Sequence, residues 1–388
     1  MADKSLYGQQ STFSASDSTL HIGIEDLITK YPDWQFPILK RWNSNVFKGQ
    51  VKSHKYEWTE RDLRPVTAKV VDLTVASGAT SFVVDTPGVF NVDDVLRKPN
   101  GEQVIVTAVA GGVNLTVSHW TGTPEAMAAG DIVTRVGVAS PQGKDADNMV
   151  IVGTEDLYNY TQIFEDVVEL SGTQRNSLIH GDENSSELIE RKHKELAEML
   201  QTALLVGTRN KNAADKRTTL GGLKYFIDTY APNNAINFGG SGTWSTDSSS
   251  SSVIAKFEDA VEAIASHNGG KPTIYMGYKA MRKFRLLDDD LIRTNRSDKA
   301  RGVGVIDTYL SQLGELDIVL LRERTGVMND LIFFVDEENV GYKAMRNRAW
   351  QTYELAHTGD SYRWQVLGEY TAKIATPKVS AYLYNLGL

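Results

Sequence analysis

The chain has 388 residues, a hydrophobic content of 41% and a formal net charge of −8, and it contains no cysteine. This length is enough for two or three compact units with buried cores. The lack of cysteine excludes disulfides and cysteine metal sites, and the acidic charge argues against nucleic-acid binding through a basic surface. No apolar run approaches the ~18 residues of a membrane-spanning helix, and the N-terminus lacks the apolar core of a signal peptide. A cytoplasmic or virion setting fits this composition.

The first 50 residues are predicted to form an N-terminal arm followed by a packing segment. Residues 1–20 are rich in Ser, Thr and Gln and have little to bury. A short helix is predicted over residues 22–30, because the helical pattern stops before Pro32. Residues 31–47 combine large apolar side chains with prolines. They are expected either to pack over their own domain or to dock on a neighbour.

An inserted all-β domain is predicted within an extended loop. The loop is predicted at residues 51–72 and 137–170. Residues 52–71 alternate in a way that is typical of extended chain, either a projecting arm or an exposed edge, and residues 148–170 alternate again after a Gly/Pro/polar return at 137–148. Between them, residues 73–136 contain short strand-like runs separated by the turn-forming sequences PG, PNG, GG and TGTPE. Strands at this spacing indicate a small antiparallel sandwich or barrel. The predicted strands are residues 81–85, 94–97, 103–109, 114–119 and 131–136.

Residues 184–207 are the clearest predicted helix. Asn184 is suited to the N-cap, with Glu187 three residues later to complete a capping box. Opposite charges recur at four-residue steps, as at Glu190 and Lys194. Gly207 is a natural helix stop, and the helix is roughly 30 Å long or more. The predicted apolar stripe consists of Ile189, Leu196, Met199, Leu200, Ala203 and Leu204.

Residues 220–345 are predicted to form an α/β unit with a mixed central sheet, because strands and helices alternate. A polar, basic link at residues 208–219 precedes this unit, and Gly221 and Gly222 are suited to a close backbone approach. The predicted elements are helices at 253–267 and 278–287, strands at 273–276, 303–309, 317–321 and 331–335, and loops at 239–252 and 288–301.

The last stretch, residues 350–388, is rich in strand-forming sequence. It is expected to pair back against the segment that carries the long helix.

No motif in the sequence indicates catalysis. There is no phosphate loop, dinucleotide fingerprint or metalloprotease helix, and the histidines have no metal-ligand spacing, so His193 is expected to be solvated. The acidic run at 288–290 lacks the pattern of a calcium loop, and residues 336–338 could do acid–base work only in a shaped cleft. Trp120 fits a sugar-stacking platform, although core packing is the favoured interpretation. We expect no enzymatic activity, no catalytic or metal site and no cofactor.

Four stretches resemble one family of bacteriophage proteins: IEDLITKYPDWQFPILKRW, YTQIFEDVVELSGTQ, LLVGTRN and TTLGGLKYFIDT. They look like major capsid proteins of tailed phages that have the Hong Kong 97-type α+β fold and a small β-domain inserted in the extended loop. The resemblance implies five parts. These are an N-terminal arm and packing segment at 1–50, an extended loop at 51–72 and 137–170, the inserted β-domain at 73–136, a peripheral domain at 171–219 and 346–388 with the spine helix 184–207, and an axial domain at 220–345.

The resemblance also implies function and partners. Such proteins assemble into hexamers and pentamers that form an icosahedral shell around double-stranded DNA, without sequence-specific DNA binding and without a membrane. Scaffolding, portal and decoration proteins are further expected partners, and assembly is expected in the host bacterial cytoplasm. The basic segments 209–217 and 279–285 are expected at subunit contacts or facing the lumen. Three alternatives stay open: an encapsulin-like nanocompartment, a carbohydrate-binding tail or adhesin protein, and an enzyme of unknown type.

Overall fold

The computed structural model describes residues 36–42, 46–61, 63–86, 88–144, 154–172, 185–239, 250–267, 269–284, 292–295, 305–321, 326–357 and 359–387. The predicted arm at 1–20, the helix at 22–30, the cap at Asn184 and the acidic run at 288–290 lie outside these ranges. The chain divides into two compact units. We call Thr59–Asp156 the barrel unit, and Met1–Trp58 together with Leu157–Leu388 the main unit.

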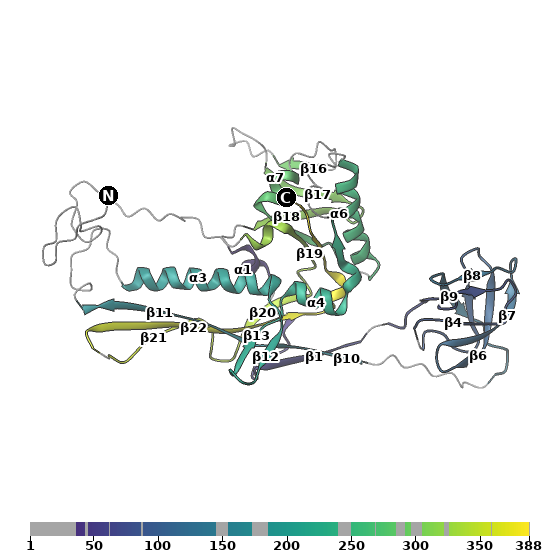
Figure 1. Cartoon of the computed structure of the whole chain (residues 1–388), viewed down its shortest axis with the longest axis horizontal. Coiled ribbons are helices and arrows are strands. Elements are labelled where there is room, and N and C mark those ends of the chain that lie inside the picture. Colours follow the sequence, from purple (N-terminus) through teal and green to yellow (C-terminus); the bar gives the residue numbers. More distant parts are fainter. Residues whose placement is uncertain are drawn as a thin grey trace. The chain divides into compact units, whose positions relative to one another are not determined.

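The barrel unit contains a closed antiparallel β-barrel (Figure 1). Its six-stranded sheet has the order β2-β9-β5-β6-β7-β4. A bridge between Val70 and Val84 joins the two ends of this sheet. Beside it, Asp85 N donates to Lys69 O at 2.9 Å. The strands are β2 (Thr67–Lys69), β4 (Ser81–Val83), β5 (Asp94–Arg97), β6 (Gln103–Ala110), β7 (Asn114–Thr121) and β9 (Ile132–Val138), with β3 (Thr74–Val75) and β8 (Met127–Ala128) forming a separate pair.

The barrel core is formed by alternate residues of its strands. Leu96, Val106, Leu115 and Val133 are completely buried within one apolar cluster. All five predicted strands are present, but the sheet extends beyond residues 73–136, because β2 precedes this range and β9 ends after it. The three residues of β2 contribute only Ala68 to the core. They therefore could not be distinguished from the charged extended segment before them.

A two-stranded ribbon lies where the chain passes between the units. It consists of β1 (Lys55–Arg61) and β10 (Thr154–Tyr160), which lie in the two segments predicted to be extended. Trp58 and Leu157 belong to a core of the main unit.

The long helix α3 (Ser185–Val206) packs on a four-stranded sheet (Figure 1). The central strand is β22 (Ser361–Ile374), which pairs with β11 (Gln162–Ser171) along one edge and with β20 (Val340–Ala344) and β21 (Gln351–Glu354) along the other. This pairing confirms that the C-terminal segment returns to the segment carrying the helix. The helix stops before Gly207, as predicted.

The rest of the main unit is built on a mixed seven-stranded sheet of order β14-β23-β19-β15-β18-β17-β16. The mixed sheet predicted for the α/β unit is therefore confirmed. Its strands are β14 (Ala235–Asn237), β15 (Thr273–Gly277), β16 (Ile292–Asn295), β17 (Val305–Ser311), β18 (Gly314–Leu321), β19 (Leu331–Val335) and β23 (Ala381–Tyr384). Its helices are α4 (Leu223–Tyr230), α6 (Ser250–Ala265) and α7 (Tyr278–Phe284), with short 3-10 turns η2 (Pro232–Asn234), η3 (Val327–Asp330) and η4 (Pro377–Val379).

Both faces of this sheet are buried. Tyr275 and Phe333 point into the core that contains the apolar residues of α3 and α4. Their neighbours Ile274 and Phe334 point into a second core with α6 and α7. Strands covered on both faces read as continuous apolar runs, which is why residues 331–335 were recognisable from sequence.

Several segments differ from their predicted structure. The last strand, β23, lies between β14 and β19 in the seven-stranded sheet rather than beside the long helix. Its sequence AYLY is apolar throughout, as a strand with two buried faces requires. Strand β16 lies in the predicted loop 288–301, and α6 begins at Ser250, inside the predicted loop 239–252. Helix α1 (Pro37–Arg41) lies in the packing segment.

The basic link predicted at residues 208–219 is a hairpin of β12 (Asn210–Asn212) and β13 (Arg217–Thr219). Its strands are short and largely exposed, so they have no hydrophobic alternation that could predict them. The close approach predicted for the glycine pair is confirmed: Gly222 N donates to Gly207 O at 2.8 Å. A Cβ at Gly222 would lie 2.5 Å from Ala203 O. Only glycine allows α4 to begin this close to the end of α3.

Candidate assembly surfaces

The apolar stripe of α3 joins the helix to the rest of the main unit. Leu196, Leu200 and Leu204 are buried in the same cluster as residues of α4 and β22. Met199 was predicted in the stripe but is 55% exposed, whereas Leu205 is buried. The stripe follows four-residue steps from Leu196, and Met199 lies one residue before Leu200, on the edge of that line. The second half of α3 therefore packs inward, and Met199 faces away from the core.

Polar contacts fix the first half of α3 to the sheet. Lys192 Nζ lies 3.0 Å from carboxylate oxygens of both Asp166 and Glu195. His193 Nε2 lies 3.0 Å from Thr352 Oγ1, and burial lowers the pKa of His193. His193 was predicted to be solvated; its ring is half-buried, because it also packs edge-on against Trp350. The predicted pair of Glu190 and Lys194 is present at 2.7 Å.

The sheet under α3 has one covered and one open face. On β11, Phe164 and Val168 are buried on the helix side. Ile163 and Val167 alternate with them and are 50% and 41% exposed. Since alternate residues of a strand point to opposite faces, the face away from α3 presents apolar side chains to solvent. We call this surface the open sheet face.

Cross-strand contacts order the open sheet face. Glu169 Oε1 accepts from Arg363 Nη2 at 2.9 Å, and Glu165 Oε1 accepts from Gln365 Nε2 at 2.7 Å. On β21, Tyr353 is 46% exposed and donates to Gln351. The surface therefore combines exposed apolar residues with fixed polar pairs, a composition typical of a protein contact.

Asn159 links the ribbon to the main unit. Its side chain is buried, with Nδ2 donating to Gly221 O and to Ala372 O, both at 2.9 Å. Its Oδ1 accepts from Gly221 N at 2.8 Å and from Tyr160 N at 2.9 Å. One amide thus connects β10, the start of α4 and β22. A single Asn in an extended segment gives no sequence signal for this role.

The basic segment 209–217 is divided between two roles. The Arg209 guanidinium lies 3.9 Å from the centre of the Tyr158 ring and donates to Tyr158 O at 2.6 Å. Arg209 therefore holds the ribbon, and its expected place at a subunit contact or facing the lumen stays a prediction. Lys211 and Arg217 are exposed on the hairpin β12–β13. In the other basic segment, Lys279 is exposed on α7.

The acidic residues Asp336 and Glu337 make hydrogen bonds within the fold. Asp336 is buried and accepts from Glu338 N and from Asn339 Nδ2 in the turn after β19. Glu337 Oε1 accepts from Tyr275 Oη at 2.5 Å and from Arg41 Nε at 2.9 Å. Burial and the neighbouring Glu337 raise the pKa of Tyr275. These carboxylates tie helix α1 to the seven-stranded sheet.

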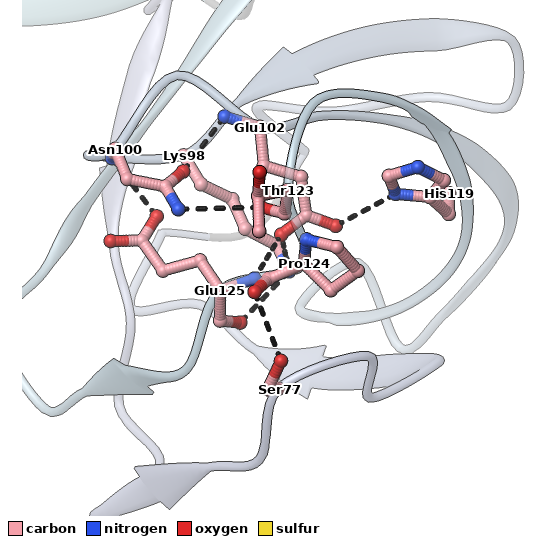
Figure 2. Close-up of polar contacts among 8 residues, drawn as sticks. All are labelled: Ser77, Lys98, Asn100, Glu102, His119, Thr123, Pro124 and Glu125. Atoms are coloured by element: carbon pink, nitrogen blue, oxygen red, sulfur yellow. Dashed lines mark hydrogen bonds and ion pairs between the residues drawn. The ribbon is translucent and has the colours of Figure 1, made fainter.

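A buried ion pair fixes one end of the barrel (Figure 2). Glu102 Oε2 lies 2.9 Å from Lys98 Nζ, and both side chains are only 1% exposed. The same carboxylate accepts from Glu125 N at 2.7 Å and contacts His119 Nδ1 at 3.1 Å. Burial alone would raise the pKa of Glu102, but the hydrogen bonds from Lys98 and His119 hold that pKa below its ordinary value.

Asn100 completes this cluster by linking the β5–β6 turn to the segment that follows β7. Its Nδ2 donates to Thr123 O at 3.3 Å, its backbone N donates to Glu125 Oε2 at 2.9 Å, and its Oδ1 accepts from Glu102 N at 2.8 Å (Figure 2). The turn and the segment are therefore held together through both side chains and backbone.

Trp120, next to this cluster in sequence, is 62% exposed. The favoured interpretation that it packs in a core is wrong.

Within the described residues, no group of three or more His, Asp or Glu side chains could hold a metal ion. In the same part of the chain, no helix is long and apolar enough to cross a membrane. What the main unit offers instead is an extended ribbon, an open sheet face and a long helix, which together define a protein built for contacts with other proteins.

Comparisons with known proteins identify its family. A family model described as SU10 major capsid protein matches residues 8–387, and the chain therefore belongs to that family. Its predicted role as a structural subunit of a bacteriophage head shell is confirmed. The mixed α/β fold with dominant strands, predicted from the resemblance to Hong Kong 97-type capsid proteins, is confirmed as well.

Solved structures resemble the chain at low sequence identity. A structure from Microbacterium phage Oxtober96 is 12% identical, covers 96% of this chain and 98% of its own, and has a TM-score of 0.49. One from Mycobacterium phage Adephagia is 9% identical, covers 88% of both chains and has a TM-score of 0.43. The holo-SrpI encapsulin of Synechococcus elongatus PCC 7942 is 11% identical, covers 61% of this chain and 78% of its own, and has a TM-score of 0.41. No curated protein matches the sequence.

Proposed function

We propose that copies of this chain form hexamers and pentamers that tile a closed icosahedral shell around double-stranded DNA. The observation that carries the proposal is the open sheet face, where Ile163 and Val167 are exposed beside the fixed pair of Glu169 and Arg363. An ordered, partly apolar surface of this kind gains stability when a partner covers it. In a shell of identical subunits, the partner is another copy of the chain, and contacts that close under rotation form rings.

The ribbon supplies a matching element. A two-stranded ribbon is marginally stable by itself, and β1 and β10 leave Glu57, Arg61 and Glu155 exposed. The base of the ribbon is anchored through Trp58, Leu157, the amide of Asn159 and the contact of Arg209 with Tyr158. Contact with a neighbouring subunit would stabilise its remaining length and would enlarge the subunit interface beyond what compact domains alone bury.

The charge of the chain is consistent with a container for DNA. A net charge of −8 repels phosphates, so the enclosed duplex would not be trapped on the inner wall. The proposal includes scaffolding, portal and decoration proteins as partners, and assembly in the host bacterial cytoplasm. Membership of a major capsid protein family supports this part of the proposal.

The test is substitution of the open sheet face, followed by electron microscopy of the overexpressed chain. Val167→Glu places a charge in the proposed contact and should reduce closed shells at least tenfold, while the soluble subunit keeps its circular dichroism spectrum. Val71→Glu is the matched control, because Val71 is a similarly exposed valine (51%) in the barrel unit. Normal yields of shells from Val167→Glu would contradict the proposed contact. A wild-type chain that stays monomeric would contradict self-assembly as a whole.

A further inference from the structure

Trp120 is exposed by an irregularity in the barrel sheet. Thr121 pairs with Gln103 and His119 pairs with Val104, so Trp120 is an extra residue of β7 with no partner on β6. Such a bulge interrupts the ladder and turns the side chain out of the regular alternation. The indole is 62% exposed as a result. Bulges are commonly found where a side chain has to be aimed at a ligand.

The residue beside Trp120 is held in a fixed position. His119 Nδ1 lies 3.1 Å from Glu102 Oε1, and Figure 2 shows the ring directed at this carboxylate. Glu102 itself is immobilised by Lys98 and by the backbone of Glu125. The imidazole still has 46% of its side chain exposed. The orientation of this ring is fixed before a ligand binds. Binding through it therefore loses less side-chain conformational entropy.

The backbone after Trp120 is equally constrained. Gly122 has φ +95°, and a Cβ there would lie 2.9 Å from Glu102 Cα. The chain from His119 to Gly122 is thus pressed against the buried ion pair of Lys98 and Glu102. Trp120 projects from a rigid support.

The residues that flank Trp120 in sequence along β7 are polar. Among β6 and β7, all of whose residues the structure describes, Trp120 is the only exposed large apolar side chain. Its neighbours Ser118, His119 and Thr121 are exposed and can all form hydrogen bonds. A protein hot spot is usually surrounded by further contacts that exclude water. One flat indole among hydroxyl and imidazole groups suits a ligand with one apolar face and a polar edge.

We propose that Trp120 and its polar neighbours form a saccharide-binding site on the barrel. A pyranose ring has C–H groups on one face, which stack on an aromatic ring, and hydroxyl groups around its edge. The hydroxyls of Ser118 and Thr121 and the fixed imidazole of His119 would bond to that edge. The shell subunit would then bind carbohydrate as an additional function, independent of assembly.

The intact chain is tested on an array of defined oligosaccharides of hexoses, N-acetylhexosamines and uronic acids, and the strongest responders are titrated by calorimetry. We expect at least one oligosaccharide to bind. Trp120→Ala should weaken it about tenfold or more, and Trp120→Phe less, because a smaller aromatic face remains. Tyr278→Ala, which removes an exposed aromatic ring of the main unit, should leave binding unchanged.

A second variant and a stability measurement exclude indirect effects. His119→Ala should weaken the same oligosaccharide without abolishing binding, since the indole is retained. Thermal unfolding of Trp120→Ala should match that of the wild type, because the side chain is exposed. The proposal fails if no oligosaccharide binds, or if Trp120→Ala binds as well as the wild type. It also fails if Trp120→Ala impairs shell formation while no saccharide binds, a result that would assign Trp120 to a protein contact.

Discussion

Buried polar side chains connect parts of this chain that are distant in sequence. Asn159 satisfies all its hydrogen-bonding capacity with backbone groups of three segments. Inside the barrel, the Glu102 carboxylate contacts the side chains of Lys98 and His119 and the backbone N of Glu125. A satisfied buried network is specific because loss of one member leaves the others unpaired in a medium of low polarity. We therefore expect these positions to tolerate substitution poorly.

The substitution Glu102→Gln tests whether the buried ion pair of the barrel tolerates replacement of one member. The variant leaves the Lys98 ammonium buried without a carboxylate, so the barrel should lose about 3–5 kcal/mol of unfolding free energy at neutral pH. Because the pKa of Glu102 is lowered in the folded state, its contribution is complete above the ordinary glutamate pKa of about 4.3 and is lost as pH falls through the lower folded value. The amide that replaces the carboxylate cannot titrate, so the variant should lack this part of the acid destabilisation.

Hydrogen exchange of strands β6 and β7 in the intact chain, measured in urea between about pH 3 and pH 7, gives the barrel stability directly. Glu155→Gln, at an exposed carboxylate of the same unit, serves as the control and should change stability by less than about 0.5 kcal/mol. Equal stability of Glu102→Gln and the wild type at neutral pH would show that the ion pair is dispensable.

The burial of individual residues could be predicted from the sequence only in part. Helical periodicity placed Leu196, Leu200 and Leu204 correctly, because they recur at the four-residue steps that keep side chains on one face of a helix. It included Met199 and omitted Leu205, since the edges of a stripe depend on which neighbours pack beside it. Trp120 was predicted to pack in a core because large aromatic side chains usually do. It lies at a bulge just after the predicted strand 114–119, where its indole is exposed.

At the scale of elements, α3 lies between the sheet of β22 and the α/β unit and packs against both. Its buried leucines lie in one cluster with Phe226 of α4 and Val366 of β22. The glycine contact between the end of α3 and the start of α4 brings the two helices close enough for this packing. The helix is therefore a structural spine, and its inner face should be much more sensitive than its outer face.

Leu200→Ala compared with Met199→Ala measures this difference on adjacent residues. Leu200 is completely buried, so its truncation should cost about 2–5 kcal/mol. Met199 is 55% exposed, and its replacement by alanine should change stability by less than about 0.5 kcal/mol. Urea denaturation followed by far-UV circular dichroism is the measurement. If both variants lost the same unfolding free energy, the inner and outer faces of α3 would contribute equally to stability.

Elements with strong periodicity were predictable, and short elements were not. The helices α3 and α6 and strands such as β15 and β19 lie within a few residues of their predictions. The hairpin β12–β13 and strand β2 were missed because short, exposed strands bury almost nothing. Strand β23 was recognised as a strand but assigned to the wrong sheet. Its partners β14 and β19 are distant in sequence, and no local pattern encodes such pairing.

At the scale of the whole molecule, each compact unit has its own core. The apolar cluster of the barrel contains only residues of the barrel unit, and the two other clusters contain only residues of the main unit. This independence predicts that the barrel can be removed without unfolding the rest.

Replacing residues 66–139 by a short Gly/Ser linker should give a folded main unit that still forms shells, because its own cores are intact. Deleting only residues 73–136 is the informative comparison. It leaves β2 and the end of β9 without their partners, so this shorter deletion should aggregate. Particle yield and the melting temperature of the shells are the readouts. Loss of folding in the longer deletion would show that the barrel supports the main unit.

The closure of the barrel between Val70 and Val84 has a consequence in a crowded shell. Many identical inserts would be held close together for the lifetime of the particle. An open sheet in that position would present unpaired N–H and C=O groups to its neighbours, and strands could then exchange between subunits. A ring without a free edge removes this risk while leaving the outward side chains available. The insert can therefore vary its surface residues without becoming a source of aggregation.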